Sequence, residues 1–219
     1  MRNLILALIF AAIMLTLLSS VSYADTVQFS TFGPGQSFQT ATNTGWSVYD
    51  TPTGFQQVAS SFAPTATFTL TQIDVAASYL SGPNQITVEL LSNAGGTPGS
   101  VIESWTLTGL PQAFNGSFTP EALTAAPGIT LMEGTTYWLE LLTSDGTVAL
   151  WNYSPNITGT TDVLGNVTGP SWVADSNQYV PAYDVQGTTA APEPSALPML
   201  SAGIILLGLV VARRGMPLT

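Results

Sequence analysis

The chain has 219 residues, of which 13 are acidic and 3 basic, so its formal net charge is -10, and it contains neither His nor Cys. The two missing residue types exclude catalytic triads built on His or Cys, zinc sites made from them, redox dithiols, disulfides and a histidine haem ligand. All three basic residues lie near the ends, so residues 25–191 carry 12 of the 13 acids and no cation. This excludes nucleic acid as a partner, because a phosphate backbone needs Lys or Arg to displace its counterions.

The first 24 residues have the pattern of a secretory signal peptide. Arg2 is followed by an apolar run over residues 4–18, and small residues occupy the positions one and three before Asp25. This pattern predicts a signal helix that is removed by cleavage between Ala24 and Asp25. The apolar run is also shorter than the roughly 20 residues that a permanent membrane-spanning helix needs.

Residues 25–191 have the composition of one β domain, rich in Thr, Val, Ser, Gly and aromatic residues. Gly and Pro punctuate this segment at short intervals, and no stretch keeps the apolar spacing of a helix for three turns. We therefore predict an all-β fold, an antiparallel β-sandwich of jelly-roll type, with an up-and-down barrel as the second choice. The expected strands are 27–32, 36–40, 45–49, 57–62, 66–80, 85–92, 101–108, 137–143, 147–153 and 179–184.

The long strand expected over residues 66–80 changes its apolar parity partway along. Phe68 and Leu70 occupy even positions, whereas Ile73 and Val75 occupy odd ones. Because a slip of one residue exchanges the two faces of a strand, this change predicts a β-bulge or a break near Thr71-Gln72.

Residues 137–153 are predicted to form a hairpin around Asp145-Gly146, a strong turn signal that allows two registers. In a two-residue turn, Glu140 lies opposite Trp151 and Trp138 lies opposite Tyr153. This register would gather flat aromatic rings and a carboxylate on one face, a combination suited to binding a sugar polymer such as an exopolysaccharide.

In the second register, a three-residue loop with a Gly bulge, Trp151 joins the core face of the hairpin. We favour this register because large aromatic side chains are mostly interior. Trp138 and Glu140 would still point outward together. Trp138, Glu140, Trp151 and Tyr153 are thus the candidate polymer-binding residues under the two registers.

The carboxylates of the domain do not mark a catalytic or metal site. They form no cluster in the sequence, and no Arg, Lys or His is present among them to orient a substrate or tune a pKa. We therefore expect no enzyme and no cofactor, with glycoside hydrolysis as the least favoured alternative. Calcium is the metal that carboxylates and loop carbonyls suit, but no Asp-x-Asp-x-Asp run identifies ligands for it.

The last 28 residues combine a proline motif, an apolar segment and a basic pair. Pro192-Glu193-Pro194 begins an extended linker, because its prolines break regular structure. Residues 204–211 are apolar on every face and suit lipid, and Arg213 and Arg214 would stop transfer and stay on the cytoplasmic side. The sequence therefore divides into a signal peptide (1–24), a β domain (25–191) and a tail with a hydrophobic helix (192–219).

This tail resembles the PEP-CTERM sorting signal of Gram-negative bacteria, which has the same three parts in the same order at the extreme C-terminus. The resemblance implies recognition and cleavage by exosortase, a membrane-embedded cysteine protease, followed by export toward the extracellular polymer matrix. The expected localisation is therefore a transient intermediate in the inner membrane, and then the cell surface or the extracellular matrix.

The middle of the chain resembles a second family, the choice-of-anchor R domain, over about residues 56–153. The resemblance is carried by five segments: Ser60-Ser61-Phe62, Phe68-Thr69-Leu70, residues 86–92, the turn 93–99, and Thr135-Thr136-Tyr137-Trp138-Leu139. That family consists of secreted modules in front of different anchoring signals, and it implies no functional residues. The expected role is structural or adhesive, with carbohydrate binding as the alternative.

Overall fold

The part of the chain that the structure describes folds into short β-strands. This computed structural model describes residues 25–143, 146–155, 163–166, 172–174 and 179–189, and within them there are fourteen strands and no helix. The strands are β1 (Thr26–Ser30), β2 (Gly45–Thr51), β3 (Gly54–Phe62), β4 (Phe68–Val75), β5 (Ala77–Ser81), β6 (Gln85–Asn93), β7 (Pro98–Thr108), β8 (Glu121–Thr124), β9 (Thr130–Leu131), β10 (Tyr137–Thr143), β11 (Val148–Asn152), β12 (Val163–Asn166), β13 (Val173–Ala174) and β14 (Tyr183–Thr188).

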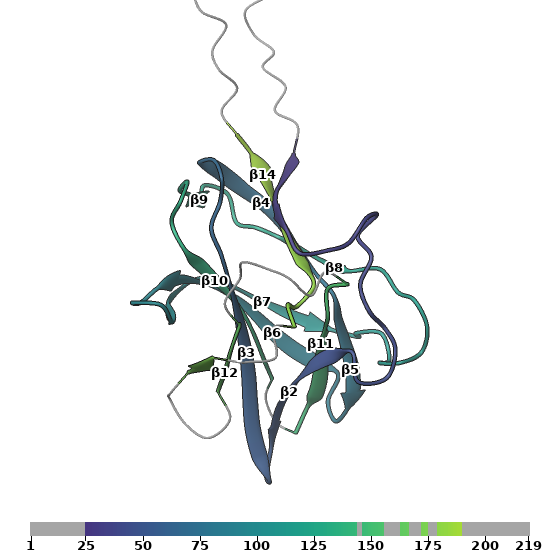
Figure 1. Cartoon of the computed structure of the whole chain (residues 1–219). Coiled ribbons are helices and arrows are strands. Elements are labelled where there is room, and N and C mark those ends of the chain that lie inside the picture. Colours follow the sequence, from purple (N-terminus) through teal and green to yellow (C-terminus); the bar gives the residue numbers. More distant parts are fainter. Residues whose placement is uncertain (1–24, 144–145, 156–162, 167–171, 175–178, 190–219) are drawn as a thin grey trace, which may run out of the picture. The chain divides into compact units, whose positions relative to one another are not determined.

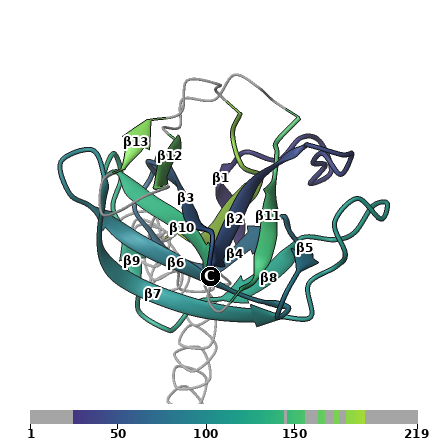
Figure 2. The same ribbon diagram turned by 90° about the horizontal axis from the view of Figure 1, so that it is seen from below.

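These strands form two curled antiparallel sheets. The five-stranded sheet has the order β1-β14-β4-β8, with β9 also paired to β4. The nine-stranded sheet has the order β5-β11-β2-β3-β10-β6-β7, and β12 pairs with both β3 and β13. Figure 2 shows the curl of the larger sheet, with β12 and β13 beside β3 and β10. The predicted all-β class is confirmed, and every strand pair within the two sheets is antiparallel.

The first and last described strands lie side by side. Thr26 of β1 pairs with Gly187 of β14, and the pairing runs on to Ser30 and Asp184. Figure 1 shows the two strands next to each other at one end of the sheet. The residues from Asp25 to Thr189 form one compact unit, and its two ends therefore leave from the same place.

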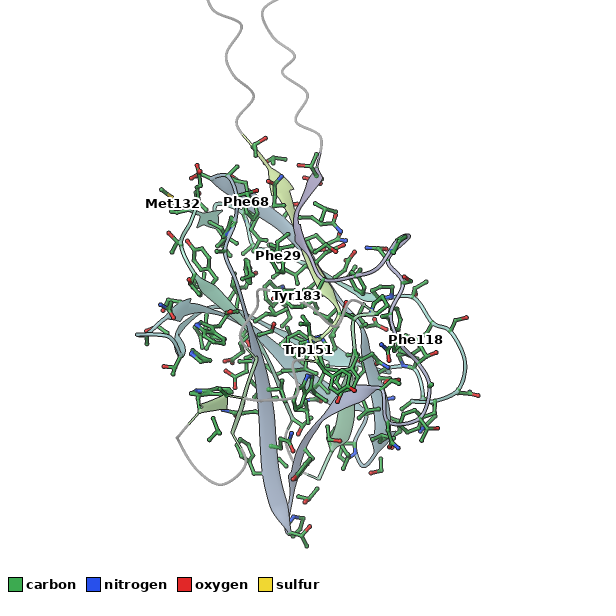
Figure 3. The ribbon with its side chains drawn as sticks, viewed as in Figure 1. Phe29, Phe68, Phe118, Met132, Trp151 and Tyr183 are labelled. Atoms are coloured by element: carbon green, nitrogen blue, oxygen red, sulfur yellow. The ribbon has the colours of Figure 1, made fainter. Side chains whose placement is uncertain are left out.

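One apolar core fills the space between the sheets. Tyr183 lies at its centre, with its ring 5.6 Å from that of Phe29 and 5.6 Å from that of Trp151. Figure 3 shows these three side chains in the interior. The Tyr183 hydroxyl, fully buried, is satisfied by the Ser60 hydroxyl at 3.2 Å and the Ser61 carbonyl at 3.1 Å. The sheets contribute buried residues that include Phe68, Leu70, Ile73, Val75 and Val185 from one, and Val58, Phe62, Val88, Leu90, Leu139 and Leu141 from the other.

The predicted bulge near Thr71-Gln72 is confirmed. Gln186 pairs with Gln72, but the next residue of β14, Gly187, pairs with Leu70, so Thr71 is the extra residue on β4. The chain then passes from one sheet to the other at Ala76, between β4 and β5. The parity change in the sequence therefore marks the bulge, and the sheet crossing follows it.

Two predictions about local structure are wrong. Residues 36–40 are not a strand, because Gln36 has a φ of 56° and the chain turns back on itself, with Gly33 and Ser37 exchanging backbone hydrogen bonds of 2.9 and 3.3 Å. The short strands β8, β9, β12 and β13 were not expected at all. Tyr179 also precedes its strand, since β14 begins at Tyr183.

The hairpin predicted for residues 137–153 does not form either. β10 pairs with β3 and β6, whereas β11 pairs with β2 and β5, so two strands separate them in the sheet. The hairpin β2–β3 occupies the space between, and its Asp50 carbonyl accepts a 2.7 Å hydrogen bond from the Gly146 amide. The turn signal at Asp145-Gly146 in the sequence does not decide which strands pair.

Candidate functional site

Trp138 and Glu140 share the outer face of β10, the face turned away from the main core. Their neighbours Tyr137, Leu139 and Leu141 point into that core, so the expected alternation along this strand is confirmed. The prediction that they are displayed to solvent is wrong, because Trp138 is 0 % and Glu140 only 5 % exposed. A sugar ring has no access to the Trp138 indole.

A small second core explains the burial of Trp138. Its indole packs with Ala59, Leu91 and the half-buried Trp172, the residue just before β13. The indole N–H donates a 3.0 Å hydrogen bond to the Asn93 side-chain oxygen. Trp138 therefore joins the outer face of the large sheet to the segment that lies over it.

Glu140 meets a second carboxylate in this region. It is the direct cross-strand neighbour of Glu89 on β6 and of Ala59 on β3, and directly opposed side chains on one sheet face have Cβ atoms about 5 Å apart. Burial, and secondly the charge of Glu89, raise the pKa of Glu140 to about 8. A carboxyl group of this kind is neutral at pH 7. The only hydroxyl bonded to the pair within the described residues is that of Ser104, 3.4 Å from Glu89 Oε1.

Two neighbouring acids are what glycoside hydrolysis needs, but the surroundings of this pair do not suit it. Retaining glycosidases hold two carboxyl groups about 5 Å apart on either side of the scissile bond. Here the more buried acid is covered, and the adjacent indole is fully enclosed. Open access for a substrate is therefore missing at this pair.

Trp151 is a core residue. It is 0 % exposed, its ring N–H donates to the Ala182 carbonyl at 3.2 Å, and its ring packs against Tyr183. This is the environment that the favoured register expected, although it arises from pairing with β2 and β5 rather than with β10. The structure does not bring Trp151 together with Trp138 and Glu140.

Tyr153, the fourth candidate, belongs to an aromatic group at the surface. Its ring stacks on that of Tyr179 with a centroid separation of 4.7 Å and an interplanar angle of 13°. Trp46 stands edge-on to Tyr153, with centroids 5.9 Å apart and an angle of 83°, and donates its ring N–H to the Tyr179 carbonyl at 2.9 Å. We call Trp46, Tyr153 and Tyr179 the aromatic cluster.

The pairing of β2 with β11 explains where the aromatic cluster lies. Trp46 is directly opposite Trp151, so both side chains are on the core face, and Tyr153 follows two residues later on the same side. Trp46 and Tyr153 are half-buried and Tyr179 is 38 % exposed, so the aromatic core reaches the surface here. Sequence reasoning missed Trp46 and Tyr179, since only the pairing brings these residues together.

A second pair of acids is enclosed on the five-stranded sheet. Asp74 and Asp184 are cross-strand partners, 7 % and 1 % exposed. The amide of Gln36 donates to both, at 2.9 and 3.1 Å, as does the amide of Gln186, at 2.9 and 3.1 Å. Burial is the largest cause that raises the pKa of Asp184, and these amides oppose the rise. The network is a structural polar layer satisfied by neutral donors.

The described residues include neither a metal-ligating cluster nor a membrane-spanning helix. No group of three or more acidic side chains among them is close enough to hold a metal ion, and no helix among them is long and apolar enough to cross a membrane. Within those ranges Asp25, the residue after the expected signal cleavage, is exposed. The remaining sorting residues lie outside the described residues: Ala24, Pro192, Glu193, Pro194, Arg213 and Arg214.

Comparison with known proteins adds no family assignment. No protein-family model matches the chain, and no curated protein matches it.

Proposed function

We propose that the chain is an exported surface or extracellular-matrix protein of a Gram-negative bacterium, with a structural or adhesive role. The observation that carries this proposal is the tail, in which Pro192-Glu193-Pro194, an apolar segment and Arg213-Arg214 follow one another in the order of a PEP-CTERM signal. Its processing partner would be an exosortase-type protease, with the inner membrane as a transient station.

The ends of the β domain are compatible with cleavage at both signals. Asp25 precedes β1 by one position, and Pro192 comes four positions after the last residue of β14, Thr188. Cuts at these two places would leave every described strand whole. Because β1 pairs with β14, the cut ends would also remain at one border of the sheet.

A jelly-roll sandwich is our proposal for the finer fold. Two antiparallel sheets around one core support a sandwich, and the crossing from one sheet to the other at Ala76 supports a wound topology of this kind. An experimental structure with a different path between the sheets would contradict it.

The test of export is the intact mass of the protein recovered outside cells that contain an exosortase. We expect a product that begins at Asp25 and ends close to Pro192. The variant Glu193→Ala should leave the uncut protein in the membrane, whereas the matched variant Glu133→Ala, at an exposed acid of the β domain, should be processed normally. Full-length wild-type protein held permanently in the membrane would refute the proposal.

Carbohydrate binding is the second candidate function, and the aromatic cluster supports it. Flat rings at the surface can stack on the apolar C–H faces of sugars. The acid pair Glu89 and Glu140 gives less support to hydrolysis, because Glu140 is buried.

A further inference from the structure

The aromatic cluster includes one exposed residue, Tyr179. Tyr153 contacts both other members of the cluster, with Tyr179 parallel to it and Trp46 edge-on. One face of the Tyr179 ring stacks on Tyr153, and the residue as a whole is 38 % exposed. The most exposed ring of the cluster is thus oriented by its stacking on Tyr153.

The backbone around the cluster is fixed by hydrogen bonds. Tyr153 donates its amide to the Thr44 carbonyl at 2.9 Å and accepts from the Gln39 amide at 2.9 Å. A bridge between Tyr153 and Pro181 ties the Tyr179 side of the cluster to the same place. A platform that is already ordered loses less conformational entropy when it binds a ligand.

Polar groups lie next to the rings. The segment before β2 places Thr42 and Asn43 at the surface, both of them exposed, and the carbonyl of the half-buried Thr44 is bonded to the Tyr153 amide. Hydroxyl and amide groups both donate and accept, as sugar hydroxyls do. Rings beside neutral hydrogen-bonding groups suit a sugar polymer better than an apolar protein surface.

The charge of the domain selects the class of polymer. Residues 25–191 carry 12 carboxylates and no Lys, Arg or His that could bind an acidic group. An anionic polysaccharide would be repelled at low ionic strength and would find no counter-charge on binding. The neighbours named around the cluster, Gln39, Thr42, Asn43 and Thr44, are uncharged.

We propose that the aromatic cluster binds a neutral polysaccharide, with Tyr179 as the outer stacking ring and Trp46 and Tyr153 as its support. This inference rests on the second candidate function, carbohydrate binding. It places the polymer contact at Trp46 on β2, Tyr153 after β11 and Tyr179 before β14. Trp138 and Glu140 are no longer candidates for this contact.

The experiment is a fluorescence titration of the full chain, purified in a detergent without a sugar head group. The probes are dextran and laminarin as neutral glucans, and alginate as an anionic polymer. We expect a neutral glucan to shift the tryptophan emission through Trp46, and Tyr179→Ala to weaken that binding by about tenfold or more, as for an aromatic anchor. Tyr49→Ala is the matched control, because Tyr49 is a half-buried tyrosine on the opposite face of the same strand as Trp46.

Three results would overturn the proposal: an unchanged emission spectrum at saturating glucan, undiminished binding by Tyr179→Ala, or an equal loss of binding in both tyrosine variants. Binding of alginate but of neither glucan would overturn the assignment to neutral polymers. The titration measures affinity in purified protein, whereas the mass measurement follows export in cells, so failure of one is distinguishable from failure of the other.

Discussion

Replacing Glu140 by Gln should stabilise the folded chain at alkaline pH. Glu140 is almost fully buried, lies opposite Glu89, and has a pKa of about 8 against an ordinary value of 4.5. Each pKa unit corresponds to about 1.4 kcal/mol, so ionising this group costs the folded state about 5 kcal/mol relative to the unfolded chain. Gln has the same shape without the charge, and its amide can donate to Glu89.

The pH dependence follows from the direction of this difference. Between pH 4.5 and about 8 the folded chain keeps the Glu140 proton that the unfolded chain has lost, so wild-type stability falls as the pH rises through this window. Above pH 8 both states are ionised and the loss is complete. The Gln variant lacks this contribution, so its advantage should be small at pH 5 and about 5 kcal/mol at pH 9.

The assay is urea unfolding at pH 5 and pH 9, followed by the emission of the buried tryptophans. Subtracting wild type from variant removes the contributions of the other acids. Glu133→Gln is the control, because Glu133 is an exposed acid next to β9 and its replacement should change stability little at either pH. A difference between Glu140→Gln and wild type that stays the same at both pH values would refute the reasoning.

Three further predictions concern the rest of the domain. Asp184→Asn should raise the midpoint of thermal unfolding at pH 7 and lose that advantage in acid, because burial raises the pKa of Asp184. The Asn oxygen can still accept from Gln36, and Gln186, which loses its bond to position 184, keeps Asp74 as an acceptor. A lower midpoint at pH 7 would contradict this. Gly187→Ala should lower the free energy of unfolding, measured in urea, by about 3 kcal/mol. The new Cβ would lie 2.2 Å from the Phe68 ring and 2.4 Å from the Thr69 carbonyl, so β4 and β14 would have to move apart. An unchanged free energy of unfolding would show that the two strands separate easily. Calcium should promote self-association at low ionic strength by bridging carboxylates of separate copies, and sedimentation velocity that does not respond to calcium would exclude this bridging.

Local sequence pattern predicted much of the strand content. Apolar alternation located most of the long strands, and the parity change in the 66–80 segment located the bulge at Thr71, because both signals depend on which face of a strand is buried. The same alternation put Trp138 and Glu140 on one side of β10. Short strands such as β9, with two residues, are too brief to show a period.

The candidate site depended on information that the pattern does not contain. The hairpin of residues 137–153 was inferred from a turn signal, whereas the β2–β3 hairpin lies between its two expected strands. Exposure of Trp138 was inferred from its face alone, but Trp172 packs against that face. The partners of a strand and the segments over its outer face come from distant parts of the chain.

The sequence alone determined the chemistry of this protein: a β domain without any cation, thiol or imidazole, followed by an apolar tail that ends near two arginines. Those properties depend only on which residues the chain contains and on their order. Only the tertiary structure decided which aromatic residues are accessible and which acids are neighbours. The physical reason is that burial and pairing are properties of contacts, and Trp46, Tyr153 and Tyr179 meet only because β2, β11 and the segment before β14 are brought together by folding.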